Sequence, residues 1–226
     1  MNVIVFASRK GGSGKSTLTV HVASHAARRP RRCLLVDADP QGSASLWRNL
    51  RQIHEPPLRD GSRGVVDILR AAKREGYEWV FVDTPPSTST VVAEAIRAAT
   101  LVVIPVRLAV FDLAAVRETI DFARKSRRPY ALVINAAPPT RNAAEAAFVT
   151  KVREVLHGLN IPVWSGQITQ RADYAASLES GEGVREYDPR SSAAGEIAAL
   201  WSAIEKSVQE VRAAYARAAA ARRNAA

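Results

Sequence analysis

Short runs that are apolar throughout alternate along the chain with longer stretches whose apolar residues recur at helical spacing. The short runs are rich in β-branched residues and lie at 3–6, 33–36, 79–82, 101–104, 132–134 and 161–164. The helical patterns lie between them, at 18–27, 65–74, 112–125 and 143–157. Strands that are apolar throughout are typical of a sheet covered on both faces. The pattern therefore predicts an α/β fold with a doubly wound, mostly parallel sheet flanked by helices.

Two stretches that combine glycine with proline interrupt this alternation, at 52–64 and 180–192, and we expect both to be surface loops. From Ala193 onward the apolar residues again recur at helical spacing, which predicts a C-terminal helix over about 193–220. After Tyr215 the sequence is mostly alanine and arginine, and we expect the tip of this basic tail to fray. Neither loop separates two cores, so we expect a single domain over residues 1–226.

The chain carries 32 lysines and arginines against 22 aspartates and glutamates, and the resulting net charge of +10 favours a polyanionic partner. Cys33 is its one cysteine. This excludes disulfides within the chain, cysteine zinc sites, and iron–sulfur clusters held by the cysteines of one chain. No basic segment precedes the first apolar run, and no stretch approaches 18 uninterrupted apolar residues. We therefore expect a cytoplasmic protein that is neither secreted nor membrane-spanning.

The glycine-rich segment after the first predicted strand has the composition of a phosphate-binding loop. It leads into a helix and reads Lys10-Gly11-Gly12-Ser13-Gly14-Lys15-Ser16-Thr17. Its glycines allow backbone N–H groups to surround a phosphate at the helix N-terminus, while Lys15 reaches the β- and γ-phosphate oxygens and the adjacent hydroxyl binds Mg²⁺. The loop departs from the ordinary form in having Arg9 where a glycine is usual and an additional lysine, Lys10.

Carboxylates follow two other predicted strands. Asp37 and Asp39 follow the second apolar run, and Asp83 follows the run at 79–82. Ligands of open α/β sheets bind at the carboxyl ends of the strands, so these carboxylates are expected to face the glycine-rich loop. In P-loop enzymes an aspartate in such a position holds Mg²⁺, and a second carboxylate orients the attacking water.

Taken together, these segments resemble the deviant Walker ATPases, a superfamily that includes ParA, MinD and the nitrogenase iron protein. The segments that carry the resemblance are KGGSGKST, VDADPQG and VFVDTPPS. It continues into Val133-Ile134-Asn135 and into the segments around 168–171 and 187–196, which look like those of small ParA proteins. The resemblance therefore covers nearly the whole chain and implies a P-loop NTPase of the deviant Walker type.

The resemblance also implies a role for each matched residue, with ATP and Mg²⁺ as cofactors. Lys15 would bind the β- and γ-phosphates, and Thr17 would contact a phosphate oxygen. The residues implied for Mg²⁺ are Ser16, Asp37 and Asp83. The remaining residues implied for nucleotide binding are Gly11, Gly12, Ser13, Gly14 and Asn135. Asp39 would orient the attacking water, and Lys10 would reach the phosphates of the partner subunit in an ATP-bound sandwich dimer.

Three kinds of function remain open at this point. A ParA-type ATPase would form an ATP-dependent homodimer on nucleoid DNA, bound without sequence preference, and an adaptor protein of the ParB type would stimulate its slow hydrolysis. A MinD-like ATPase would need a C-terminal membrane helix with bulky apolar residues, which the alanine-rich tail lacks. A metabolic ligase resembling dethiobiotin synthetase would need a polar substrate pocket. The net charge and the segment Asp39-Pro40-Gln41-Gly42 favour the ParA type, without stable membrane anchoring.

Two further groups of residues need an interpretation. Arg141 and Arg171 resemble positions near the DNA-contacting arginines of the family, and they are our candidates for DNA binding. His21 and His25 have the i, i+4 spacing of a metal site on one helix. Because no third ligand accompanies them, we expect ordinary packed or surface histidines.

Overall fold

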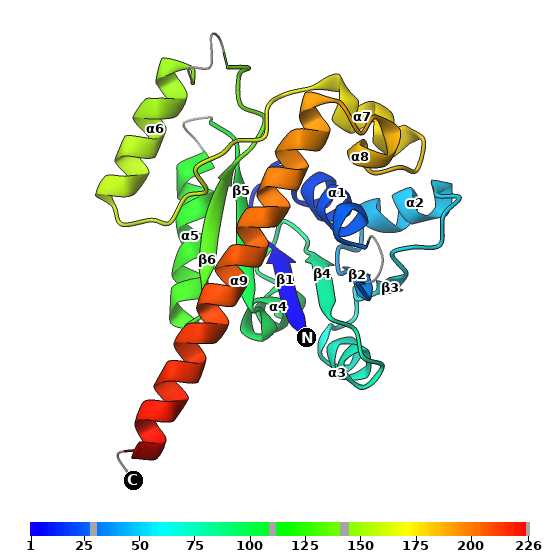
Figure 1. Cartoon of the computed structure of the whole chain (residues 1–226). Coiled ribbons are helices and arrows are strands. Elements are labelled where there is room, and N and C mark those ends of the chain that lie inside the picture. Colours follow the sequence, from blue (N-terminus) through cyan, green and yellow to red (C-terminus); the bar gives the residue numbers. More distant parts are fainter. Residues whose placement is uncertain (28–30, 109–111, 141–144, 225–226) are drawn as a thin grey trace.

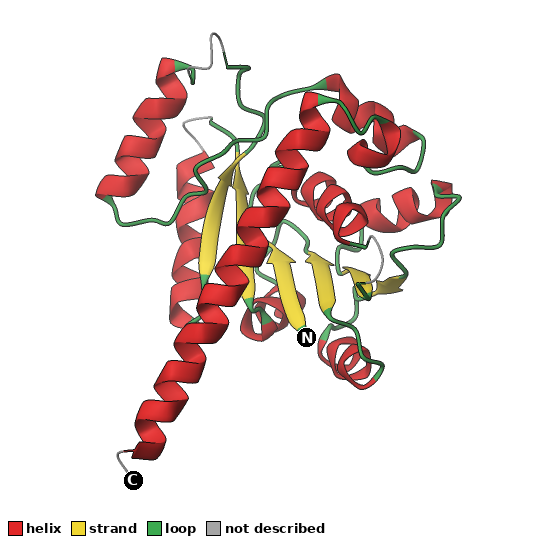
Figure 2. Cartoon of the chain, in the orientation of Figure 1, coloured by secondary structure: helices red, strands yellow, loops and turns green. Residues whose placement is uncertain are grey.

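The computed structural model describes residues 1–27, 31–108, 112–140 and 145–224, which form a parallel sheet between two layers of helices (Figure 1, Figure 2). The strands are β1 (Asn2–Phe6), β2 (Cys33–Asp37), β3 (Leu58–Asp60), β4 (Trp79–Asp83), β5 (Leu101–Val106) and β6 (Tyr130–Ile134). The helices are α1 (Lys15–Ala26), α2 (Ser43–Leu50), α3 (Val66–Arg74), α4 (Thr90–Ala98), α5 (Asp112–Lys125), α6 (Ala147–Gly158), α7 (Ala172–Glu179), α8 (Val184–Tyr187) and α9 (Ser192–Asn224). The strand order is β3-β2-β4-β1-β5-β6 and each pairing is parallel, which confirms the predicted fold class.

Alternate residues of the central strands enter two separate cores. In β1, Val3 and Val5 belong to the core that includes α3, α4 and α5, whereas Ile4 and Phe6 belong to the core that includes α1 and α9. Every residue of β1, β2 and β4 is buried. Burial on both faces explains why these strands appear in the sequence as continuous apolar runs.

Three segments differ from what the pattern predicts. Residues 52–64 are not only a loop, because they contain the edge strand β3, which pairs with β2 and is too short to show a period. Residues 180–192 contain the single helical turn α8. The apolar run 161–164 is not a strand: it contributes one isolated bridge, between Val163 and Leu132, and Pro162 lacks the N–H that a ladder needs.

The C-terminal helix α9 is longer than expected. It continues to Asn224, through the residues that we expected to fray. Alanine and arginine have high helix propensity, so this segment is helical although it has little apolar surface to bury. Within the part of the chain that the structure describes, no helix is both long enough and apolar enough to cross a bilayer.

Candidate nucleotide-binding site

The loop after β1 lies in an open cavity of about 590 Å³ at the carboxyl edge of the sheet, between α1, α2 and α7. Strands β1, β2 and β4 end in register, so Phe6 and Asp37 are both paired with Asp83. This register brings the glycine-rich loop and the predicted carboxylates to one edge, as the sequence predicts for a ligand site of a parallel sheet.

Gly14 and Asn135 fix the position of the loop. Gly14 precedes α1 in the left-handed conformation, with φ 97°, and a Cβ at this position would collide with the side-chain amide of Asn135. Asn135 follows β6 and donates a hydrogen bond from Nδ2 to the carbonyl oxygen of Ser13, at 2.7 Å. The first turn of α1 has backbone N–H groups without helical partners, which is the usual basis for binding an anion.

Lys15, the first residue of α1, is buried next to two carboxylates. Its side-chain Nζ donates to the carbonyl oxygen of Lys10 at 3.3 Å. Burial lowers the pKa of Lys15, while the charges of Asp83 and Asp39 act in the opposite direction. A buried cation at the N-terminus of a helix is well placed to bind phosphate oxygens.

Asp83 is fully buried, and neither carboxylate oxygen has a hydrogen bond of ordinary geometry to the described residues. Burial raises the pKa of Asp83 to about 7, with a smaller upward effect from Asp37, while the nearby Ser16 hydroxyl and the Lys15 ammonium lower it. A desolvated carboxylate without a partner is unfavourable unless it meets a cation or its water shell. The donor set of Asp83, Asp37 and the Ser16 hydroxyl therefore fits Mg²⁺.

Asp37 and Asp39 are held in different ways. Oδ2 of Asp37 accepts hydrogen bonds from the backbone N–H and the hydroxyl of Ser45, at 2.8 and 2.7 Å, so it also anchors the first turn of α2. Asp39 lines the cavity, and its Oδ1 accepts from the backbone N–H of Gln41 at 3.0 Å. Asp37 is thus a structural anchor as well as a candidate Mg²⁺ residue, and Asp39 faces the space that a ligand would fill.

The structure places most of the other predicted residues in the same loop. The loop residues that line the cavity with Lys15 are Gly11, Gly12, Gly14, Ser16 and Thr17. Of the other two loop residues, Ser13 is buried and Lys10 is half-buried. His21 is a buried packing residue whose Nδ1 accepts from the backbone N–H of Val184 at 3.1 Å, which agrees with its interpretation as a packed histidine.

Arg171, one of the two arginines predicted to bind DNA, is not among the described residues that line this cavity. Arg171 donates to Oε1 of Glu196 from Nε and Nη2, at 3.1 and 3.0 Å, and is half-buried. Arg141 lies outside the described residues. DNA contact by either residue stays a prediction.

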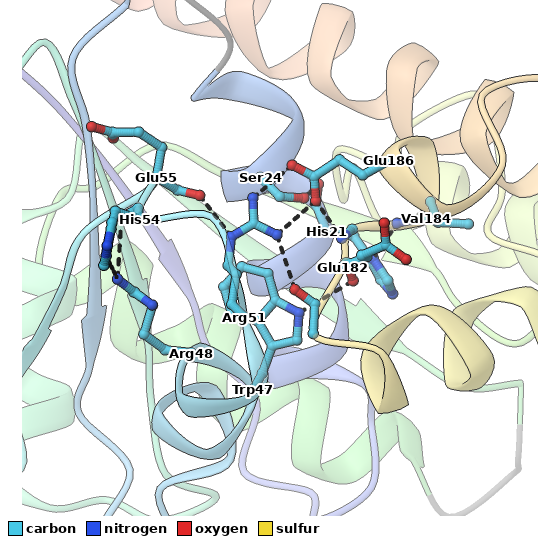
Figure 3. A network of polar contacts seen from close by, with 12 residues as sticks. His21, Ser24, Trp47, Arg48, Arg51, His54, Glu55, Glu182, Val184 and Glu186 are labelled. Carbon is cyan, nitrogen blue, oxygen red and sulfur yellow. Dashed lines mark hydrogen bonds and ion pairs between the residues drawn. The ribbon is translucent and has the colours of Figure 1, made fainter.

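The sequence analysis missed a network behind the α2 wall of the cavity (Figure 3). The buried Arg51 forms a two-pronged ion pair with Glu186, at 2.7 and 2.6 Å, and donates to the carbonyl oxygens of Gly181 and Glu55. Its guanidinium lies 4.7 Å from the ring centre of Trp47, a cavity residue. Arg51 lies 135 residues from Glu186, and no local pattern in the sequence separates it from the exposed arginines.

A second missed contact lies at the entrance of the loop. Arg9 occupies the position where the ordinary phosphate-binding loop has a glycine, and its side chain forms an ion pair with Glu118 of α5. The departure from the ordinary motif therefore connects the loop to a neighbouring helix.

Comparison with known proteins identifies the family. Residues 4–184 match the CobQ/CobB/MinD/ParA nucleotide binding domain. The chain is 32% identical over 194 residues to the maintenance of carboxysome distribution protein A of Gloeobacter kilaueensis, a match that covers 76% of this chain and 88% of that protein. It is 34% identical over 159 residues to the chromosome-partitioning ATPase Soj of Thermus thermophilus, covering 56% of this chain and 64% of Soj.

Solved structures share the fold. MinD of Pyrococcus horikoshii in complex with Mg-ADP has a TM-score of 0.73 and 14% identity, over 91% of this chain and 96% of that one. An McdA–ATP complex from Cyanothece has a TM-score of 0.67 and 14% identity, over 96% of both chains. By the family match and by its sequence relatives, the chain belongs to the CobQ/CobB/MinD/ParA family, as a deviant Walker ATPase of the ParA/MinD type.

Proposed function

We propose that this ATPase acts as a ParA-type positioning protein that distributes DNA or another intracellular cargo over the nucleoid. ATP would join two copies in a sandwich dimer that binds DNA without sequence preference. An adaptor of the ParB type, carried by the cargo, would stimulate the otherwise slow hydrolysis and release the dimer. The observation that carries the proposal is that Lys15 and Asp39 line one cavity, with the buried Asp83 close to Lys15, in a chain with a net charge of +10.

The roles proposed for the site residues follow from their surroundings. Lys15 would neutralise the β- and γ-phosphates, and the hydrogen bond from its Nζ to the Lys10 carbonyl, which keeps the ammonium at the loop, supports this role. Mg²⁺, which supplies charge stabilisation to the phosphoryl group, would be held by Ser16 and Asp83, with Asp37 acting through its water shell. Asp39 would orient the attacking water, because it lines the cavity without an ion-pair partner among the described residues.

Lys10 would act across the dimer. A cation that enters from a second subunit neutralises phosphate charge only when two chains meet face to face, so it would couple ATP binding to association. The relatives that support a positioning role are the carboxysome distribution protein and Soj.

Three variants test this assignment. Lys15→Ala should lose ATP binding in calorimetry with Mg²⁺, whereas Asp39→Ala should bind ATP, fail to hydrolyse it and accumulate as a dimer in light scattering. Lys10→Ala should still bind ATP but not dimerise. Lys73→Ala, at an exposed position in α3, is the matched control and should behave like the wild type. Full ATP-dependent dimerisation by Lys10→Ala would contradict a lysine that acts across the interface.

The DNA-binding step is tested with unrelated duplexes in ATP, ADP and no nucleotide. Dimerisation doubles the phosphate contacts, so ATP should strengthen binding strongly and high salt should weaken it. DNA binding that does not depend on the nucleotide would remove the switch. ATP-dependent binding to anionic vesicles without DNA binding would instead indicate a MinD-like function.

A further inference from the structure

The distal part of α9 leaves the body of the protein. Its buried apolar residues end with Ile204 and Val208, which pack against the sheet. From residue 212 to residue 221 every side chain is exposed. Figure 1 shows this part of α9 extending past the amino-terminal edge of the sheet, beside no other element. At 1.5 Å per residue, the segment from residue 209 to 224 projects about 24 Å. We call residues 212–224 the arm.

The arm is helical although its described side chains, at residues 212–221, are exposed. Its described side chains form no hydrogen bond or ion pair with the described part of the body. Its sequence is mostly alanine with arginine, two of the strongest helix formers, so local propensity favours the helix that packing does not stabilise. A helical arm is therefore favoured before any partner binds, which limits the entropy lost on binding.

The charge of the arm has one sign. Its arginines are Arg212, Arg217, Arg222 and Arg223. No aspartate or glutamate follows Glu210, so the arm contributes +4 to a whole-chain net charge of +10. The described side chains of Arg212 and Arg217 are exposed. Guanidinium groups bind phosphate oxygens in a forked geometry, and an exposed row of like charges attracts a polyanion.

Other occupants fit the arm poorly. Tyr215 is its one residue with a large ring, and the alanines around it bury too little surface to hold a helix in a bilayer. A second copy of the same helix would need an apolar seam, yet beyond Val211 no stripe of large apolar residues continues and the arginines would repel each other. The charge complements a phosphate backbone.

We propose that the arm binds the phosphate backbone of double-stranded DNA. This inference rests on the proposed function, because it locates the DNA contact of the same ATPase. α9 begins beside α7 and α8 at the nucleotide edge and ends beyond the opposite edge (Figure 1). Dimerisation through the nucleotide edge thus leaves both arms accessible. Each arm contributes to DNA affinity in the ATP and the ADP state alike, and the dimer gains by having two.

The test compares two double variants of the full-length protein. Arg212→Ala with Arg217→Ala removes two exposed charges and keeps the helix, because alanine is the best helix former. Lys73→Ala with Arg74→Ala removes two exposed charges from the last turn of α3, at the same edge of the sheet but on the body. DNA affinity is measured by fluorescence anisotropy on unrelated duplexes over a salt series, with ATP and with ADP.

The arm variant should bind DNA about tenfold more weakly at low salt, and its plot of log affinity against log salt should be shallower by about 0.9 for each lost phosphate contact. ATP turnover without DNA should stay at the wild-type level, and the α3 variant should keep most of its DNA affinity. Unchanged affinity in the arm variant, or an equal loss in the α3 variant, would overturn the inference.

The outcomes separate this inference from the proposed function. If the arm variant loses DNA affinity but the wild type binds DNA equally well with ATP and ADP, DNA binding by the arm is supported and the proposed nucleotide switch is contradicted. If the DNA affinity of the wild type depends on ATP and the arm variant retains this affinity, the nucleotide switch is supported and DNA binding by the arm is contradicted. Binding to vesicles of phosphatidylglycerol that the arm substitutions abolish, with DNA binding unchanged, would also overturn the inference.

Discussion

At Asp83, burial and the neighbouring carboxylates raise the pKa, whereas the Ser16 hydroxyl and the Lys15 ammonium lower it. The pKa of this carboxyl is raised to about 7 from an ordinary value of 3.8, because its charged form is desolvated. The folded protein therefore holds the proton to a higher pH than the unfolded chain does. Stability from this residue is present below the unfolded pKa and is lost as pH rises through the folded one.

Asp83→Asn should consequently raise the free energy of unfolding of the nucleotide-free protein at pH 8, by roughly 4 kcal/mol at most. The gain should shrink towards pH 5, where most of the wild-type carboxyl is protonated. The same variant should lose the Mg²⁺-dependent part of ATP binding. Urea unfolding at both pH values and calorimetry with and without Mg²⁺ measure these effects. A variant that is no more stable than the wild type at pH 8 would show that the buried charge is compensated.

The pKa of His21 is shifted in the opposite direction. Burial lowers its pKa from 6.5 to about 4, and a backbone hydrogen bond at Tyr174 opposes this. The folded state resists protonation, so stability is full above pH 6.5 and falls as pH drops towards 4. His21→Asn places a non-titrating acceptor near Nδ1, where the backbone N–H of Val184 donates.

Relative to the His21→Asn variant, the wild type should lose about 2 kcal/mol of unfolding free energy between pH 7.5 and pH 5. Urea unfolding at these two pH values measures the difference. His157→Asn, at an exposed position, is the matched control and should track the wild type. Parallel curves for wild type and His21→Asn would mean that His21 is protonated in the fold without cost.

At the scale of elements, α2 is held at both ends. Its first turn is bonded to Asp37 through Ser45, and Arg51 follows its last turn and is paired with Glu186 before α9. Gly181 belongs to this contact: it has φ 71°, and a Cβ there would lie 2.6 Å from the backbone of Leu50. The wall of the nucleotide cavity thus depends on a segment far along the chain.

Arg51→Lys should destabilise the fold by about 2 kcal/mol, because an ammonium cannot replace the forked pair and the two carbonyl contacts. It should also weaken ATP binding, since Trp47 lines the cavity beneath the guanidinium. Arg48→Lys is the control, because Arg48 bonds only with His54 on the surface among the described residues. Thermal unfolding and calorimetry would report both effects. Equal stability and equal ATP affinity of the two variants would contradict a role for Arg51 in supporting the cavity.

At the scale of the whole molecule, the first part of α9 packs into the core and its last part is exposed to solvent. Trp201 packs edge-on against Trp79 at 4.7 Å and lies 5.8 Å from Phe81, whereas residues 212–221 are exposed. A chain that ends after Val211 should therefore have a free energy of unfolding within about 0.5 kcal/mol of that of the full chain. Its helical signal in circular dichroism should be smaller. Trp201→Ala should cost about 3–5 kcal/mol. A large loss of stability on truncation would show that the arm contacts the body.

The pattern of apolar and polar residues along the sequence was sufficient to predict the fold class and the central residues of the candidate site. Apolar runs, helical spacing and the glycine-rich loop are local properties, and parallel strands bring their carboxyl ends to one edge whatever their exact order. The placement of Lys15 and Asp39 in one cavity, with Asp83 close to Lys15, could therefore be predicted before the strand order was known.

What the pattern could not supply depends on contacts between distant segments. β3 exists because β2 provides a free edge for three residues, and the end of α2 is positioned by Glu186, 135 residues beyond Arg51. A strand of three residues is too short to show a hydrophobic period. A buried arginine cannot be distinguished from an exposed one in the sequence. The burial of His21 and the exposure of the arm were likewise decided by packing, because only the folded chain determines which charges lose their water and which keep it.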